Sequence, residues 1–150
     1  MLPIIEKECM LFDIDVQSKD EAIVAMIEAF DKAGYLNDKD TYYKDVLARE
    51  EVFSTYIGYG IGLPHGKSDG VEESGICVAR LNNEIVWNDE TGDTINFIIM
   101  IAVRNKSDCN LHLQILSKLS RLLMHEDFRD RIMNGDVQEV FRVLEKELEV

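Results

Sequence analysis

The chain has 150 residues, of which 46% are hydrophobic and 30% are charged, and 29 acidic against 16 basic side chains give a formal net charge of −13. This length and composition predict one domain, residues 1–150, with a proper buried core. The negative charge would repel a phosphate backbone, so we expect no nucleic-acid partner and a surface suited to a protein partner with a basic rim.

Membrane insertion, secretion and a disulfide framework are not indicated. No window approaches the roughly 18 apolar residues that a transmembrane helix needs, and the N-terminal residues do not begin a signal peptide. The three cysteines, Cys9, Cys77 and Cys109, lack Cys-x-x-Cys spacing and stand beside apolar residues, which favours buried, reduced thiols. We therefore expect a cytoplasmic protein.

The first part of the chain is expected to supply strand segments and two helices. Strand-type stretches lie between positions 4 and 16. Ser18 followed by Glu21 forms a capping box that opens a helix with an apolar stripe, and Gly34 is placed to end that helix. A second helix is expected to start after position 38 and end near position 50, which places Arg49 at its C-terminal end.

The middle of the chain changes to apolar runs of strand length, and helices return after them. Residues 75–81 and 95–103 are such runs, and the second is apolar almost throughout, as in a central strand covered on both faces. Residues 85–87 are expected to form a short edge strand. Three more helices are expected, from after position 108 to near 125, over 127–133 and over 136–148. Helices at both ends around central strands predict an α/β fold, a three-layer α/β/α sandwich.

A proline–histidine pair between glycines is the feature most indicative of function, in the segment Gly60-Ile61-Gly62-Leu63-Pro64-His65-Gly66. The glycines keep the backbone free of Cβ bulk, so that something large can come close, and Pro64 fixes its own φ. The residue before the proline is biased to an extended conformation. We therefore expect the His65 imidazole at a strand end or tight loop, as a nucleophile, ligand or proton shuttle.

Several other kinds of site do not fit this pattern. The glycine spacing matches neither the dinucleotide fingerprint nor the Walker A motif, and no Gly-x-Ser-x-Gly nucleophile elbow is present. His65, His112 and His125 lack the spacing of helical metal ligands, so we expect no metal. Zinc held by His65 and His112 remains as a weak alternative, and we expect His125 to be a surface residue at a helix end.

The remaining class of chemistry is phosphoryl transfer through a phosphohistidine. It needs an imidazole nitrogen with an available lone pair and donors for the phosphoryl oxygens, because catalysis is mainly positioning and charge stabilisation. Candidate donors are the Arg49 guanidinium, the Thr55 hydroxyl and His112 in the first turn of its helix. Each also has a purely structural interpretation. Arg49 would be a cation at a helix end, Thr55 a hydroxyl that caps a loop, and His112 a residue bordering the core.

These residues carry a resemblance to a known family. The motif Arg49-Glu50-x-x-x-Ser54-Thr55-x-x-Gly58-x-Gly60-Ile61-x-Leu63-Pro64-His65-Gly66-Lys67, with Leu111-His112-Leu113 further on, resembles the enzyme IIA signature of the fructose/mannitol class in the bacterial phosphoenolpyruvate-dependent sugar phosphotransferase system. The chain departs from the family pattern at Tyr56 and Tyr59, which flank positions that small residues often fill. The resemblance covers essentially the whole chain and implies a single type-2 IIA domain, as a free-standing subunit or a separated domain. It also implies an α/β/α sandwich with a central mixed β-sheet and no cofactor.

The resemblance further implies roles for individual residues. His65 would accept a phosphoryl group through Nε2 from the phosphocarrier protein HPr and pass it to a cysteine of enzyme IIB. Enzyme IIB serves the membrane component IIC in sugar uptake, with fructose as the nearest sugar and mannitol or another hexitol close behind. Arg49 and His112 match the family's active-site arginine and second histidine, and Ser54 and Thr55 would support phosphate binding. The alternative is a regulatory phosphoprotein of the nitrogen-related branch, which acts through protein–protein contacts.

Overall fold

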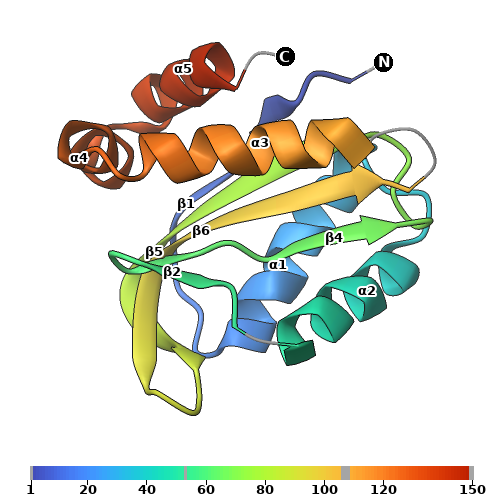
Figure 1. The fold of residues 1–150 in the computed structure, drawn as a ribbon, viewed down its shortest axis with the longest axis horizontal. Coiled ribbons are helices and arrows are strands. Elements are labelled where there is room, and N and C mark those ends of the chain that lie inside the picture. The colour runs from blue at the N-terminus through green and yellow to red at the C-terminus, as the bar shows by residue number, and fades with distance from the viewer. Residues whose placement is uncertain (1, 53, 106–108, 149–150) are drawn as a thin grey trace.

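The computed structural model describes residues 2–52, 54–105 and 109–148, apart from the side chains of residues 109 and 112. A six-stranded sheet lies between two layers of helices (Figure 1). The strands are β1 (Ile5–Ile14), β2 (Tyr56–Gly58), β3 (Ile61–Gly62), β4 (His65–Ser68), β5 (Gly75–Asn88) and β6 (Asp93–Arg104). The helices are α1 (Lys19–Lys32), α2 (Lys39–Val52), α3 (Cys109–Leu122), α4 (Glu126–Asn134) and α5 (Val137–Glu147). This arrangement confirms the expected three-layer α/β/α sandwich.

The sheet is mixed, as the resemblance implied. Its strand order is β1-β5-β6-β3-β2, and β4 also pairs with β6. The β1–β5, β3–β6 and β4–β6 pairs are parallel, whereas β5–β6 and β2–β3 are antiparallel. Strand β6 therefore lies in the interior of the sheet, with β5 along one side and β3 followed by β4 along the other.

The expectation of a short edge strand at residues 85–87 is wrong. These residues form the second half of the long strand β5, where Ile85 pairs with Ile95 and Val86 with Thr94 after a register shift. The exposed polar residues 82–84 interrupt the apolar pattern at that irregularity, which makes one strand look like two. Trp87, near the end of β5, is buried in the core.

Two apolar clusters hold the layers together, one on each face of the sheet. The side chains of β6 alternate between them: Ile98, Met100 and Ala102 pack with the α1–α2 layer, while Phe97, Ile99 and Ile101 pack with the α3–α5 layer. This double burial explains why the sequence of β6 is apolar almost throughout. In the described ranges, no helix is long and apolar enough to cross a membrane.

Local signals read from the sequence account for the ends of α1. The Ser18 hydroxyl accepts a hydrogen bond from the Glu21 amide at 3.1 Å, and the Glu21 carboxylate accepts one from the Gln17 amide at 3.2 Å. Gly34 adopts a φ of 90°, the left-handed conformation that glycine takes after a helix. Among the cysteines, Cys9 and Cys77 are buried free thiols, as expected, and the prediction for the Cys109 side chain lies outside the described residues.

Candidate functional site

His65 is the first residue of β4, at an interruption in the pairing along β6. Gly62 pairs with Ile98 and His65 pairs with Ile101, so two residues separate the two short strands. Pro64 has no amide hydrogen, and the Leu63 amide turns away to the Thr55 carbonyl at 3.1 Å. This break presents the partly exposed His65 at a strand end, where the sequence predicted it.

Glycines beside His65 do allow close approach, but the neighbours are parts of the protein itself. A Cβ on Gly62 would lie 2.7 Å from Cε2 of Trp87, and a Cβ on Gly66 would lie 3.2 Å from Cγ2 of Val46 in α2. The hydroxyl of Tyr42, also in α2, donates to the Ile101 carbonyl at 2.8 Å. These contacts seat α2 directly on β4, so that the end of α2 lies next to the site.

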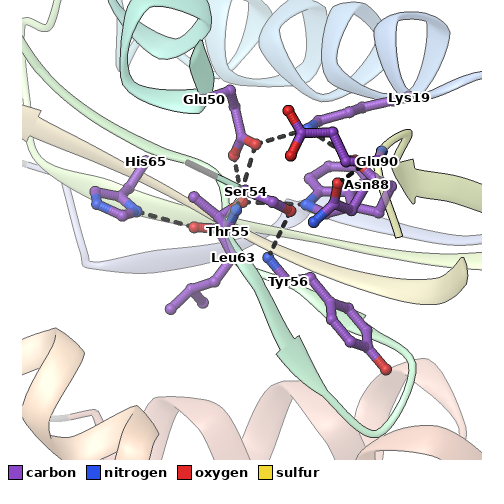
Figure 2. A network of polar contacts seen from close by, with 10 residues as sticks. Lys19, Glu50, Ser54, Thr55, Tyr56, Leu63, His65, Asn88 and Glu90 are labelled. Carbon is purple, nitrogen blue, oxygen red and sulfur yellow. Dashed lines mark hydrogen bonds and ion pairs between the residues drawn. The ribbon is translucent and has the colours of Figure 1, made fainter. Parts of the chain in front are cut away.

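The imidazole of His65 is oriented by backbone. Its Nδ1 lies 2.9 Å from the Leu63 carbonyl oxygen, and because a carbonyl can only accept, Nδ1 must carry the proton (Figure 2). In the neutral ring, the lone pair is then on Nε2. Burial lowers the pKa of His65 below its ordinary value of 6.5, against the raising effect of the Leu63 hydrogen bond. The positive charge of Arg49 lowers the pKa further, and the negative charge of Glu50 raises it.

Arg49 and Glu50 occupy the last turn of α2, and their opposite charges both act on His65. The Glu50 side chain is only 6% exposed and accepts a hydrogen bond from Lys19 Nζ at 2.6 Å. It also accepts from the Thr55 hydroxyl and from the Thr55 amide at 3.4 Å (Figure 2). A buried, paired carboxylate therefore stands behind the histidine.

The other predicted site residues differ in how they are placed. Thr55 is buried, and its hydroxyl is engaged by both Glu50 and Trp87 Nε1, the latter at 3.1 Å. The Ser54 hydroxyl accepts from the Tyr56 amide at 3.2 Å and so shapes the turn into β2. Position 112 lies in the first turn of α3, as predicted. The His112 side chain is outside the part of the chain that the structure describes, so its role stays a prediction. His125 is exposed and occupies the N-cap position of α4 without a side-chain capping hydrogen bond, in agreement with its prediction as a helix-end surface residue.

Sequence reasoning missed Lys19, Trp87 and the part played by Glu50. Glu50 stands beside Arg49 in the motif, so its position was visible. Its partner Lys19 lies 31 positions earlier, and Trp87 lies 32 positions after Thr55. No spacing rule in a single sequence connects residues so far apart.

The arrangement as a whole suits group transfer onto a ring nitrogen. A neutral imidazole with its lone pair on Nε2 is a nucleophile without any general base. The Arg49 guanidinium, which acts on the same ring, is suited to bind an oxyanion.

Comparison with known proteins agrees with this chemistry. Residues 3–147 match the family model "Phosphoenolpyruvate-dependent sugar phosphotransferase system, EIIA 2". The chain is 35% identical over 149 residues to Multiphosphoryl transfer protein 2 of Escherichia coli K12. The aligned region covers 99% of this chain and 18% of that protein. The chain is also 35% identical over 121 residues to a fructose-specific EIIA component of Haloferax volcanii, covering 79% of this chain and 77% of that one.

Among solved structures, the complex of mannitol enzyme IIA with phosphorylated enzyme IIB from Escherichia coli matches with a TM-score of 0.79 and 27% identity, covering 95% of this chain and 98% of the matched chain. The chain spans about a fifth of the length of the first curated relatives it matches. The family resemblance found in the sequence is confirmed. The chain belongs to the EIIA 2 family of the phosphoenolpyruvate-dependent sugar phosphotransferase system and is a phosphocarrier domain of its fructose/mannitol class, a phosphotransferase.

Proposed function

We propose that His65 accepts a phosphoryl group through Nε2 from phospho-HPr and passes it to a cysteine of enzyme IIB. Enzyme IIB in turn serves a membrane component IIC in the uptake of a fructose-type sugar, and the carrier works in the cytoplasm. The observation that carries this proposal is the hydrogen bond from Nδ1 to the Leu63 carbonyl, since it puts the nucleophilic lone pair on Nε2. The lowered pKa of His65 supports it, because a larger share of the ring is neutral near neutral pH.

The transfer itself is a displacement at phosphorus. The Nε2 lone pair forms the new N–P bond while the bond between phosphorus and the donor atom of HPr breaks, and the leaving atom keeps that electron pair. The ring keeps its proton on Nδ1, so it gains a positive charge. In the second transfer a thiolate of enzyme IIB attacks phosphorus, the N–P bond breaks, and neutral His65 is restored.

The other predicted residues have supporting roles in this proposal. Arg49 binds the phosphoryl oxygens and offsets the charge that spreads over them in the transition state. His112, in the first turn of α3, is the second donor. Ser54 and Thr55 support phosphate binding from the turn before β2, and for Thr55 the bond to Glu50 favours an indirect part.

The proposed partners rest on relatives. The Haloferax protein is named fructose-specific, and the Escherichia coli mannitol IIA is seen with phosphorylated enzyme IIB. These names favour transport over the regulatory alternative, and they make a fructose-type IIB the first acceptor to test.

The experiment is phosphorylation with phosphoenolpyruvate, enzyme I and HPr, followed by intact-mass measurement. The wild-type protein should gain one acid-labile phosphoryl group, and His65→Ala should gain none. His125→Ala is the matched control and should behave as wild type, because His125 is exposed at the start of α4. A His65→Ala protein that still gains the group would overturn the assignment.

Acceptor choice tests the finer claim. Phosphorylated protein is mixed with fructose-, mannitol- and other hexitol-type IIB proteins, and transfer to each is timed. The fructose-type IIB should be fastest, and a faster mannitol-type IIB would overturn the sugar assignment. Loss of sugar uptake on gene deletion is expected, whereas unchanged uptake would favour the regulatory role.

A further inference from the structure

A series of hydrogen bonds, joined through the covalent bonds of Thr55 and Leu63, connects α1 to the imidazole of His65; Figure 2 shows these residues. Lys19 binds Glu50, and Glu50 binds Thr55. The Thr55 carbonyl accepts from the Leu63 amide at 3.1 Å, and the Leu63 carbonyl accepts from His65 Nδ1 at 2.9 Å. Leu63 is therefore held on its amide side and orients the histidine on its carbonyl side.

The Thr55 hydroxyl has a fixed direction in this series of hydrogen bonds. Trp87 Nε1 can only donate, so at 3.1 Å it occupies an acceptor site on Thr55 Oγ1. The single hydroxyl proton then points to Glu50. With the Thr55 amide also directed at Glu50, this carboxylate sets where the Thr55 backbone lies, and through it where the Leu63 peptide lies.

The position of the Lys19–Glu50 ion pair is unfavourable for the free energy of folding, so stabilisation of the fold does not explain it. Lys19 is the first residue of α1, where the helix dipole disfavours a cation, and only 25% of its side chain is exposed. Its Nζ also donates to the Trp87 carbonyl at 3.0 Å and lies 4.6 Å from the centre of the Trp87 ring. Removing a buried carboxylate and its partner from water is expensive, so this geometry favours a positional role for Glu50.

We propose that Glu50 is a positioning residue of the phosphoryl-transfer site. Held by Lys19, it fixes the Thr55 and Leu63 backbone that orients His65, and its negative charge offsets the positive charge that the ring gains when the N–P bond forms. The part of this inference that concerns the reaction rests on the proposed function. The part that concerns the orientation and charge of the resting imidazole does not.

The test begins with the unphosphorylated protein. The ring proton resonances of His65 are titrated by NMR, and ring nitrogen shifts report which nitrogen carries the proton. In Glu50→Gln the amide keeps the shape but loses the charge, so the pKa of His65 should fall below the wild-type value, because a neighbouring anion has been removed. Glu51→Gln is the matched control, since Glu51 is the next acid in α2 and is exposed. It should leave the titration of His65 unchanged.

The rate of phosphoryl gain from phospho-HPr is the second readout. Misplacement of the ring by about an ångström costs on the order of 10²-fold, so Glu50→Gln and Thr55→Val should each be slower by roughly 10- to 100-fold. Thr55→Ser keeps the hydroxyl and should restore most of the rate. Glu28→Gln, which breaks an exposed ion pair to Lys39 of 2.8 Å, controls for the loss of a salt bridge and should not slow transfer.

The outcomes separate the two proposals. A folded Glu50→Gln protein with wild-type titration and wild-type rate would overturn the positioning role. If Glu50→Gln does not fold, the Thr55→Val and Thr55→Ser pair decides, and equal rates in the two variants would overturn it. Phosphorylation of a His65→Ala protein would refute the proposed function, while the titration would still decide whether Glu50 controls the resting ring.

Discussion

The contact between Gly62 and Trp87 makes a sharp prediction about the packing behind the site. A Cβ at Gly62 would lie 2.7 Å from Cε2 and 3.0 Å from both Cζ2 and Nε1 of Trp87. Trp87 is only 2% exposed, and Gly62 is held by its pairing with β6. In Gly62→Ala the indole must therefore move, and its hydrogen bond to Thr55 must stretch.

The size of the effect follows from two opposing terms. Overpacking of a well-packed site costs about 1–3 kcal/mol, while replacing glycine by alanine recovers about 0.4–1 kcal/mol through the unfolded chain. With the middle of each range, about 2 less about 0.7, the net loss of unfolding free energy should be about 1.3 kcal/mol. For a domain of this size that corresponds to a fall in Tm of about 3–5 °C.

A double-mutant cycle with Trp87→Phe isolates the contact. Phenylalanine is smaller and lacks the indole nitrogen and the outer ring, so Gly62→Ala should cost little or nothing in the Trp87→Phe background. Urea unfolding followed by circular dichroism gives the four free energies, and fluorescence of Trp87, the sole tryptophan, reports its displacement in Gly62→Ala. A coupling energy below about 0.5 kcal/mol, with the same cost in both backgrounds, would refute the reasoning.

Three further predictions concern pH, a partly buried guanidinium and a buried phenol. Because folding lowers the pKa of His65, the unfolded chain binds more protons just below pH 6.5, so this histidine reduces stability as the pH falls through that window. His65→Gln should flatten the loss measured by urea unfolding between about pH 7.5 and about pH 5.5. Arg80 Nη1 lies 3.3, 3.1 and 2.7 Å from the carbonyls of Ile132, Met133 and Gly135. Arg80→Met should therefore cost about 1.5–3 kcal/mol and speed amide hydrogen exchange in α4, and unchanged exchange would contradict this. Tyr42→Phe removes a buried hydrogen bond to Ile101 and should cost about 1 kcal/mol by urea unfolding, with an unchanged midpoint as the contrary result.

The layers and most helices could be predicted because their signals are local. The cap at Ser18, the glycine at 34 and the apolar stripes each act within one or two turns of chain. Strands β2, β3 and β4 escaped prediction because they have only 3, 2 and 4 residues, too few for a period to show. Strands β3 and β4 form because β6 offers them a long edge to pair with, and β2 pairs in turn with β3, so tertiary contacts and not local signals create all three.

In the candidate site, too, local signals predicted some features and tertiary contacts determine the others. The motif pointed to His65 and Arg49, but the order of strands that brings α2 beside β4 is not written in any local pattern. The glycines illustrate the limit: the sequence indicated that bulk comes close to Gly62 and Gly66. Only the structure identifies that bulk as Trp87 at the first and α2 at the second.

The neighbouring residues Arg49 and Glu50 carry opposite charges, and we expect each to stabilise a different state of His65 during the proposed transfer. Before transfer the ring must be neutral, and burial together with Arg49 favours that state by lowering the pKa of His65. After the proposed transfer the ring is cationic and the phosphoryl group anionic, so we expect Arg49 to stabilise the phosphoryl oxygens and Glu50 to stabilise the ring. A site with Arg49 alone would disfavour the charged ring and slow acceptance, and one with Glu50 alone would raise the pKa of His65 and leave a smaller share of the ring neutral for attack. Adjacent positions at the end of one helix supply both charges at a fixed separation, which is why we expect exchange of the pair, Arg49→Glu with Glu50→Arg, to abolish transfer although the net charge of the chain is unchanged.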